Sequence, residues 1–275
     1  MAFYGCEFSF NGIPSSQYGL MLYDFGAPVE DGIFSSGLEI SEDRTARRYR
    51  PLFYGVTQNT PLTFELTFGV NPDGIDAYEP LDRWDMAAIA TWLTGQDGYR
   101  YLEIAQPDME AMRYRCIITD LSYVTYGKMP WAMRCTVTCD SPFAYLRPVT
   151  YEIIPDTNFT EVTINSRAPV PYYPRLEYDY VYNSSLSNSA KALRIINVTD
   201  NMRNFQLGGG MLVSNQHIVI DNENEIITTD ADINLYDYFN YTFFRLLPGD
   251  NELRIRGSQS SVLRMICEYP INIGG

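Results

Sequence analysis

Short runs of aromatic and β-branched residues, broken by Gly, Pro, Asn or Asp about every ten residues, extend along the whole chain. In the clearest run, residues 61–68, apolar and polar side chains alternate, so every second residue from Leu62 to Phe68 would lie on one face of a half-buried strand. The chain has 22 Tyr and 14 Phe to build such runs, and 19 Gly and 16 Pro to end them. Because these residues favour strands joined by tight turns, the sequence predicts a mainly β fold.

One segment has a helical period instead. Between Pro80 and Gly95, apolar residues recur at steps of three and four: Leu81, Trp84, Ala88, Ile89 and Trp92. Pro80 suits a first helical turn, and we expect Gly95 to end the helix in a left-handed conformation. Because a Trp side chain hides a large apolar area, we expect both tryptophans on a buried face that anchors the helix on a sheet, rather than in a ligand site.

The chain divides into two halves of different character. Before residue 145 lie the helix and the Asn11-Gly12 pair, which is typical of a two-residue hairpin turn. After residue 146, Asn, Ser and Tyr become frequent, and three prolines within residues 169–174 exclude a central strand there. Further strands are predicted at residues 176–181, 191–198, 204–207, 216–220, 225–229, 241–244, 252–256 and 263–268.

These patterns predict two domains. Residues 1–145 would form an N-terminal β-sandwich-type domain with one α-helix and a hairpin arm. Residues 146–275 would form a C-terminal β-sandwich, because many short strands in about 100 residues are typical of that architecture.

Residues 39–50 form the only dense basic cluster of the sequence, and they include acidic residues as well. One interpretation is a solvated loop or exposed hairpin. The other is an arm that pairs with an acidic neighbouring subunit, because Arg is enriched at interfaces. The candidate interface residues are Arg44, Arg47, Arg48, Arg50, Phe53 and Tyr54.

The charge balance restricts the partners. The chain has 34 acidic and 20 basic residues, a net charge of −14. Since nucleic-acid affinity depends largely on clustered Lys and Arg, no sequence-specific nucleic-acid partner is expected.

No run approaches the roughly 18 apolar residues of a transmembrane helix, so no membrane partner is expected either. The first residues lack the pattern of a signal peptide, and we expect synthesis in the cytoplasm.

Side chains that carry chemistry are few. His217 is the only histidine and lies in a strand-like run, where a hydrogen-bonded structural role is expected, and zinc sites with two histidines are excluded. The five cysteines lack C-x-x-C pairs and are expected to be reduced and buried: Cys6, Cys116, Cys135, Cys139 and Cys267.

We predict no catalytic residue, no metal and no cofactor, and therefore no enzyme. A hydrolase remains a minor alternative, because 34 acids offer carboxylate pairs by chance.

Tyrosines are abundant in the C-terminal half. Some of their rings could form a platform on which a sugar stacks, and the candidate glycan-stacking residues are Tyr236, Tyr238 and Tyr241. This interpretation makes a host cell-wall glycan a candidate partner. The alternative is that the rings pack inside the sandwich or at subunit interfaces, where Tyr is enriched.

Several motifs follow one another along the first half: Phe10-Asn11-Gly12, residues 50–56, residues 61–68, the helix end at residues 92–95, residues 98–102, and Cys139-Asp140-Ser141-Pro142-Phe143-Ala144-Tyr145. In this order they resemble the distal tail proteins, or baseplate hub proteins, of long-tailed, non-contractile phages (siphophages). The last block is the most specific. The polar turn near residue 223 and the Pro248-Gly249 turn are similar to the galectin-like or carbohydrate-module-like sandwich of the same family.

The resemblance implies a structural role in the virion, after synthesis in the cytoplasm of a bacterial host. It implies a homo-hexameric ring at the distal end of the tail, built by the N-terminal domains. It also implies contacts with the tail tube protein, the tail-tip (tail-associated) protein and a receptor-binding protein. A glycan-binding adhesion module that contacts the host cell wall is the alternative function.

Overall fold

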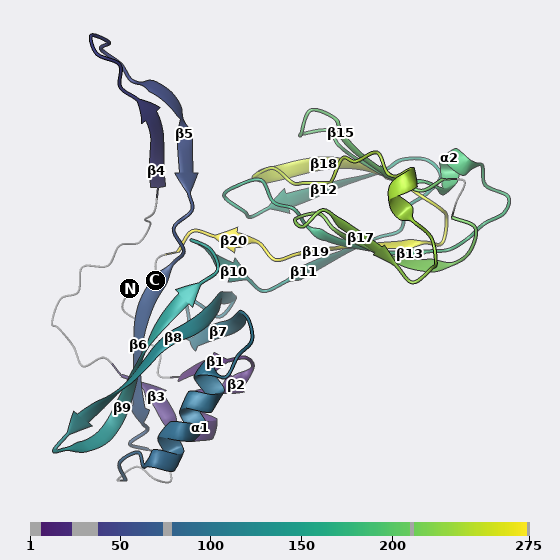
Figure 1. Cartoon of the computed structure of the whole chain (residues 1–275). Coiled ribbons are helices and arrows are strands. Elements are labelled where there is room, and N and C mark those ends of the chain that lie inside the picture. The colour runs from purple at the N-terminus through teal and green to yellow at the C-terminus, as the bar shows by residue number, and fades with distance from the viewer. Residues whose placement is uncertain (1–6, 24–37, 74–78, 210–211, 274–275) are drawn as a thin grey trace. The chain divides into compact units, whose positions relative to one another are not determined.

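The structure is a computed structural model of the 275-residue chain and describes residues 7–23, 38–73, 79–209 and 212–273 (Figure 1). The chain divides into two compact units, Met1–Leu146 with Asn272–Gly275, and Arg147–Ile271. Antiparallel strands dominate both units, which confirms the predicted mainly β class. Within the described ranges, no helix is long and apolar enough to cross a bilayer.

The first unit is organised around one large antiparallel sheet. Its strands are β1 (Glu7–Phe10), β2 (Ile13–Pro14), β3 (Leu20–Leu22), β6 (Thr63–Val70), β7 (Arg100–Ala105), β8 (Met112–Tyr126), β9 (Met129–Cys139) and β10 (Ala144–Leu146). They follow the order β2-β1-β7-β8-β9-β6-β3, and β10 pairs with β8. Alternate residues of β6 are buried, as the alternation in residues 61–68 predicts.

The predicted sandwich of this unit differs from what is found. Its described strands form one continuous ladder rather than two sheets, apart from the separate hairpin of β4 (Leu38–Asp43) and β5 (Leu52–Gln58). The reason is the 15-residue strand β8, which pairs with β7 and β10 near its start and with β9 over most of its length. A register irregularity between Ile118 and Asp120 adds local twist to this long strand.

The turn between β1 and β2 has the predicted chemistry. Asn11 and Gly12 both have positive φ, 54° and 75°. Two successive left-handed residues form the tight turn that suits the twist of a hairpin, and Asn-Gly is the pair that adopts it most readily. The short 3-10 helix η1 (Ser15–Tyr18) follows directly.

Helix α1 (Arg83–Thr94) forms where the apolar period predicts it. Asp82 caps its N-terminus: the Asp82 carboxylate accepts the backbone N–H groups of Trp84 and Asp85 at 2.7 and 2.8 Å. In return, the Asp85 carboxylate accepts the Asp82 N–H at 3.0 Å, which completes a capping box. The helix therefore begins at this acidic pair rather than at Pro80.

Two expectations about α1 were wrong. Trp84 is 83% exposed, whereas Trp92 is 7% exposed. At about 100° per residue, Trp84 lies about 140° around the helix from the buried Ile89, which is outside a single apolar stripe. Gly95 has φ −79° and is not left-handed. A Cβ at Gly95 would collide with the carbonyl oxygen of Thr91, so close approach explains the glycine.

The second unit is a sandwich of two antiparallel sheets (Figure 1). One sheet has the order β11-β19-β13-β16-β17, with β11 (Val149–Ile153), β13 (Arg175–Tyr180), β16 (Gln216–Asp221), β17 (Ile226–Thr229) and β19 (Val262–Cys267). The other has the order β12-β18-β14-β15, with β12 (Thr160–Ser166), β14 (Leu193–Asn197), β15 (Arg203–Leu207) and β18 (Gly249–Arg256). The remaining elements are α2 (Asn188–Lys191), η2 (Leu235–Tyr238) and β20 (Pro270–Ile271).

The strand predicted at residues 241–244 is absent. Tyr241 has a left-handed φ of 55°, which interrupts extended structure, while Phe243 and Phe244 are buried in an irregular segment. The backbone N–H of Phe244 donates to the buried side chain of Asn222 at 2.8 Å. The apolar pattern of residues 241–244 therefore comes from side chains that are buried in an irregular segment, not from a strand that pairs with a sheet.

Four predicted thiols are free and buried: Cys116, Cys135, Cys139 and Cys267. Cys6 lies outside the described residues. His217 lies on β16, and its Nδ1 is 2.6 Å from Asp179 Oδ1, which confirms the hydrogen-bonded strand histidine.

Candidate functional site

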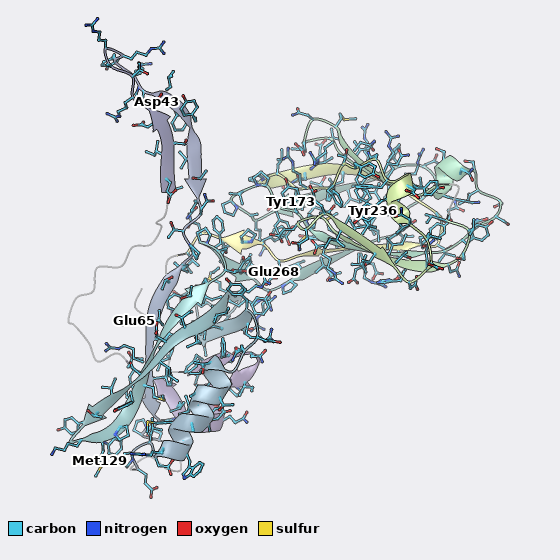
Figure 2. The ribbon with its side chains drawn as sticks, viewed as in Figure 1. Asp43, Glu65, Met129, Tyr173, Tyr236 and Glu268 are labelled. Atoms are coloured by element: carbon cyan, nitrogen blue, oxygen red, sulfur yellow. The ribbon has the colours of Figure 1, made fainter. Side chains whose placement is uncertain are left out.

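The hairpin of β4 and β5, with its connection at residues 44–51, is called the arm from here on (Figures 1 and 2). Its strands form a two-stranded sheet, and in the described residues neither strand pairs with a third. All six residues of β4 are exposed. An isolated two-stranded hairpin is marginally stable in water, so the arm is the element of this unit that gains most from a covering partner.

One face of the arm is mainly apolar, with Gln58 and Glu42 as its polar members. Ile40 pairs with Val56 and Leu38 pairs with Gln58, and directly opposite side chains lie on the same face. Ile40 is 64% exposed, Val56 49% and Phe53 63%. Contiguous exposed apolar side chains of this kind mark interaction surfaces in soluble proteins.

A bulge changes the direction of β5 beside this face. Gly55 pairs with Ser41 and Phe53 pairs with Glu42, which leaves Tyr54 as an extra residue. Gly55 has φ 149°, a conformation that a side chain would strain, so glycine permits the bulge. The bulge leaves Tyr54 67% exposed.

The connection between the two strands is basic, and it follows Asp43, which Figure 2 labels. Arg44 donates from Nε to Glu42 Oε1 at 2.8 Å. The Arg50 guanidinium carbon lies 5.9 Å from the centroid of the Tyr49 ring, and that ring is 94% exposed. These contacts are local and solvent-accessible, so they contribute little to stability.

Arg47 and Arg48 form no ion pair within the part of the chain that the structure describes. Two charges are therefore available to a partner. The structure places all six sequence-predicted interface residues together in the arm: Arg44, Arg47, Arg48 and Arg50 in the connection, Phe53 and Tyr54 on β5. Their role as a subunit interface stays a prediction.

The apolar face itself was not predicted from the sequence. Leu38 and Ile40 alternate with polar residues on β4, and Leu52 to Val56 form the opposite run. The period-two pattern was the available signal, but the bulge at Tyr54 shifts the register and hides which residues share a face.

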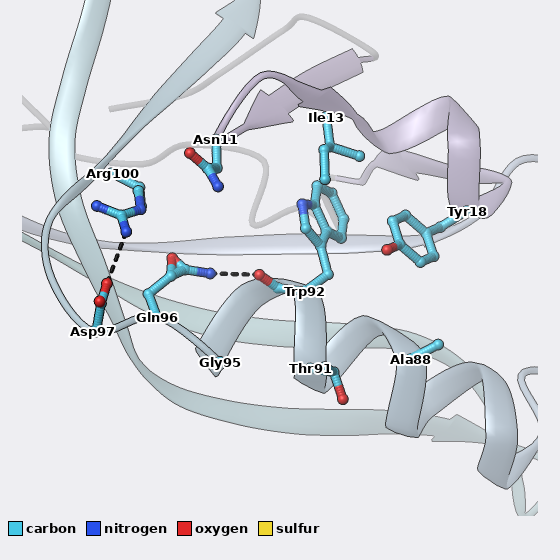
Figure 3. Close-up of a pocket in the computed structure, with 10 residues that line it drawn as sticks. All are labelled: Asn11, Ile13, Tyr18, Ala88, Thr91, Trp92, Gly95, Gln96, Asp97 and Arg100. Carbon is cyan, nitrogen blue, oxygen red and sulfur yellow. Dashed lines mark hydrogen bonds and ion pairs between the residues drawn. The ribbon is translucent and has the colours of Figure 1, made fainter.

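A pocket of about 490 Å³ lies between α1 and the β1–β2 hairpin with η1 (Figure 3). The stacked rings of Tyr18 and Trp92 form one wall. The Gln96 amide donates to the Trp92 carbonyl, and Arg100 pairs with Asp97 at 2.7 Å. The pocket is lined by no histidine and by a single carboxylate, that of Asp97, which already pairs with Arg100, so it lacks the pair of carboxylates that the hydrolase alternative requires.

The three candidate glycan-stacking tyrosines differ in what their side chains do (Tyr236 is labelled in Figure 2). The Tyr236 hydroxyl accepts the Ile227 N–H at 2.8 Å and donates to the Glu225 carbonyl at 3.2 Å, so it fastens η2 to the β16–β17 hairpin. Tyr238 is 40% exposed and Tyr241 71% exposed. Only these two rings are free enough to offer a stacking surface.

Comparisons with known proteins agree on a phage tail. One family model, described as a phage tail protein N-terminal domain, matches residues 3–141, and another, described as a phage tail C-terminal domain, matches residues 144–267. No curated protein matches this sequence.

The solved structures that are similar to this chain include two phage proteins. The Dit protein of phage SPP1, described as a paradigm of the hub adsorption apparatus in phages that infect Gram-positive bacteria, has 14% sequence identity and a TM-score of 0.66, over 96% of this chain and 98% of that chain. A chain of the phage P2 baseplate in its activated conformation with calcium has 9% identity over 90% of each chain, and its TM-score of 0.48 is too low to carry an argument.

At 14% identity, the likeness to SPP1 Dit shows a shared fold. The family models show more, because the first covers half of the chain and the second covers most of the remainder. They confirm the resemblance that the motifs of the sequence indicate. The chain belongs to a family of phage tail proteins, with the N-terminal and C-terminal domains that define it.

Proposed function

We propose that this tail protein is the hub at the distal end of a siphophage tail. Six copies would close into a ring that joins the tail tube to the tail-tip protein and the receptor-binding proteins. The first unit would build the ring and the second would extend from it as a galectin-like module. No covalent chemistry is part of this function.

The observation that carries the proposal is the exposed apolar face of the arm, with Ile40 and Phe53 each more than 60% exposed. If each arm covers a different surface on the next copy, the contact is heterologous, and such a contact closes into a ring when the rotation permits. The arginines of the connection would pair with acidic side chains of the next copy. Such side chains are abundant, because the chain as a whole has a net charge of −14.

The test is the mass of the full chain by light scattering after size exclusion, at several concentrations. We expect a mass that approaches six times 31.5 kDa. The double variant Ile40→Ser/Phe53→Ser removes apolar area from the arm and should shift the mass toward the monomer. Ile154→Ser is the matched control, because Ile154 is also 64% exposed but lies in the second unit. A wild-type chain that is monomeric at every concentration contradicts self-assembly through the arm.

A second candidate function, binding of a cell-wall glycan, is supported by the exposed rings of Tyr238 and Tyr241. Their exposure leaves ring faces on which a sugar can stack. The full chain should then sediment with purified cell walls, and Tyr241→Ala should release it. Equal sedimentation of the wild type and the variant would exclude this platform.

A further inference from the structure

Two arginines of the second unit lie directly opposite each other without an acid between them. Arg194 on β14 and Arg256 on β18 are register partners in the four-stranded sheet. The flanking residues Leu193, Ile195 and Ile255 are fully buried, so both arginines are on the outer face of the sheet. Like charges that lie directly opposite each other destabilise a sheet. A bound counter-charge would remove this cost.

The hydrogen bonds of the two guanidinium groups leave donors unused. Arg194 donates from Nε to Asn204 Oδ1 at 2.8 Å. Arg256 donates from Nη2 to the carbonyl and hydroxyl oxygens of Ser189, both at 3.3 Å. Arg256 Nε is buried without any hydrogen-bond partner. Since a guanidinium has five N–H donors, most of them have no protein acceptor here.

No carboxylate compensates the two arginines. Asp156 forms an isolated backbone bridge with Arg256, but its carboxylate accepts hydrogen bonds from Thr157 and from the Gln259 amide instead. Across the described residues, neither Arg194 nor Arg256 forms an ion pair with a carboxylate. By contrast, Arg254, two residues earlier on the same strand, pairs with Glu161 at 3.1 Å. Arg254, the other outward-facing arginine of β18, thus has an acidic partner, whereas Arg194 and Arg256 have none.

An aromatic ring completes the arrangement. Phe159 immediately precedes β12 and is 37% exposed. Its ring centroid is 5.2 Å from the guanidinium carbon of Arg256 and 5.8 Å from that of Arg194. Cation–π contacts of this kind help to hold the two groups in place, but a ring does not replace an acceptor for their N–H donors.

We propose that Arg194 and Arg256 form a binding site for a phosphate group. A phosphate group has several acceptor oxygens in a tetrahedral arrangement and as many as two negative charges, so it can bind two guanidinium groups at once. A single carboxylate is already satisfied by one Arg in a bidentate pair. The exposed part of Phe159 lies beside this site, where the sugar or polyol of a phosphate ester can pack.

The site would select for this group rather than for polyanions in general. The net charge of −14 repels a negative polymer at long range, so attraction must come from a local pair of cations. The source of the group is either free inorganic phosphate or a phosphate ester on a larger molecule. The experiment separates the two sources by comparing inorganic phosphate with glycerol 1-phosphate.

The test uses the full chain and titrates inorganic phosphate at constant ionic strength, with chloride as the reference anion. Saturable binding is followed by phosphorus NMR line width and by the rise of Tm, since a ligand that binds only the folded state raises Tm. We expect Arg194→Gln and Arg256→Gln each to weaken phosphate binding at least tenfold. Arg254→Gln is the matched control and should bind like the wild type. Tighter binding of glycerol 1-phosphate than of phosphate would assign the site to an ester.

The proposal is overturned if the wild type shows no saturable phosphate binding, or if both glutamine variants bind as tightly as the wild type. Folding of the variants is checked by Tm without phosphate. Arg194→Gln removes a like-charge contact, so its Tm in chloride should equal or exceed that of the wild type. If Arg256→Gln fails to fold, the Arg194→Gln result decides. Neither outcome bears on ring assembly, which the mass measurement tests through the arm.

Discussion

Trp92 and Tyr18 stack with their ring centroids 4.6 Å apart, while the Trp92 indole N–H donates to the Phe10 carbonyl at 3.1 Å. These two contacts fasten α1 to η1 and to β1 across long stretches of sequence. The Phe8 ring stacks on the same indole at 5.7 Å. Trp92 is therefore the side chain through which the helix joins the sheet of the first unit.

Replacing Trp92 should cost far more stability than replacing Trp84. We expect Trp92→Ala to lower the free energy of unfolding of the first unit by about 3–5 kcal/mol, because it opens a large cavity and leaves the Phe10 carbonyl without this donor. Trp84→Ala should change it by less than about 0.5 kcal/mol, because Trp84 is 83% exposed. Urea unfolding followed by circular dichroism compares the two. Equal losses would contradict the packing described here.

The helix shows both what the sequence can predict and where prediction stops. A period of three and four residues and an acidic start are local signals, and they locate α1 to within a few residues. Which tryptophan is buried depends on the centre of the buried stripe, and this is set by the sheet beneath it. Trp84 and Trp92 both fit the period, and only tertiary packing separates them.

The candidate surfaces also differ in whether local sequence or tertiary structure determines them. The arginines of the arm could be identified because charge density is local in sequence. The apolar face of the arm could not, because the bulge at Tyr54 decides which residues oppose each other. The juxtaposition of Arg194 and Arg256 depends on the pairing of β14 with β18, and no local pattern indicates that pairing.

Charge reversal in the arm should weaken self-association without unfolding the chain. Arg48 is exposed and has no ion pair among the described residues, so Arg48→Glu removes only an interaction with a partner. We expect the concentration for half-maximal assembly to rise about tenfold, and the wild type to show a similar rise in high salt. Light scattering at graded protein concentrations measures this. Arg167→Glu, on an exposed residue of the second unit, should leave assembly unchanged; equal effects of both reversals would indicate a general charge effect.

A buried asparagine should be essential to the second unit. Asn251 is 0% exposed, donates from Nδ2 to the carbonyls of Leu247 and Gly249 at 2.7 and 2.9 Å, and accepts the Leu247 N–H at 2.8 Å. Asn251→Ala leaves these buried groups unpaired, so we expect a loss of about 2–4 kcal/mol in the free energy of unfolding. Asn165→Ala is the control, because the bond from Asn165 to Asp250 is exposed. A loss below about 1 kcal/mol for Asn251→Ala would show that water replaces the lost bonds.

The buried thiol of Cys135 should make stability depend on pH in the alkaline range. Burial raises the pKa of Cys135 from 9.0 to about 12. Because the folded-state pKa is the higher one, this stabilisation is complete below about pH 9 and is lost as the pH rises toward 12. Cys135→Ala removes the titrating group, so its destabilisation relative to the wild type should shrink by about 2 kcal/mol between pH 7.5 and pH 10.5. Urea unfolding at the two pH values measures the difference, and a difference that does not change with pH would show that the thiol is not protected by burial.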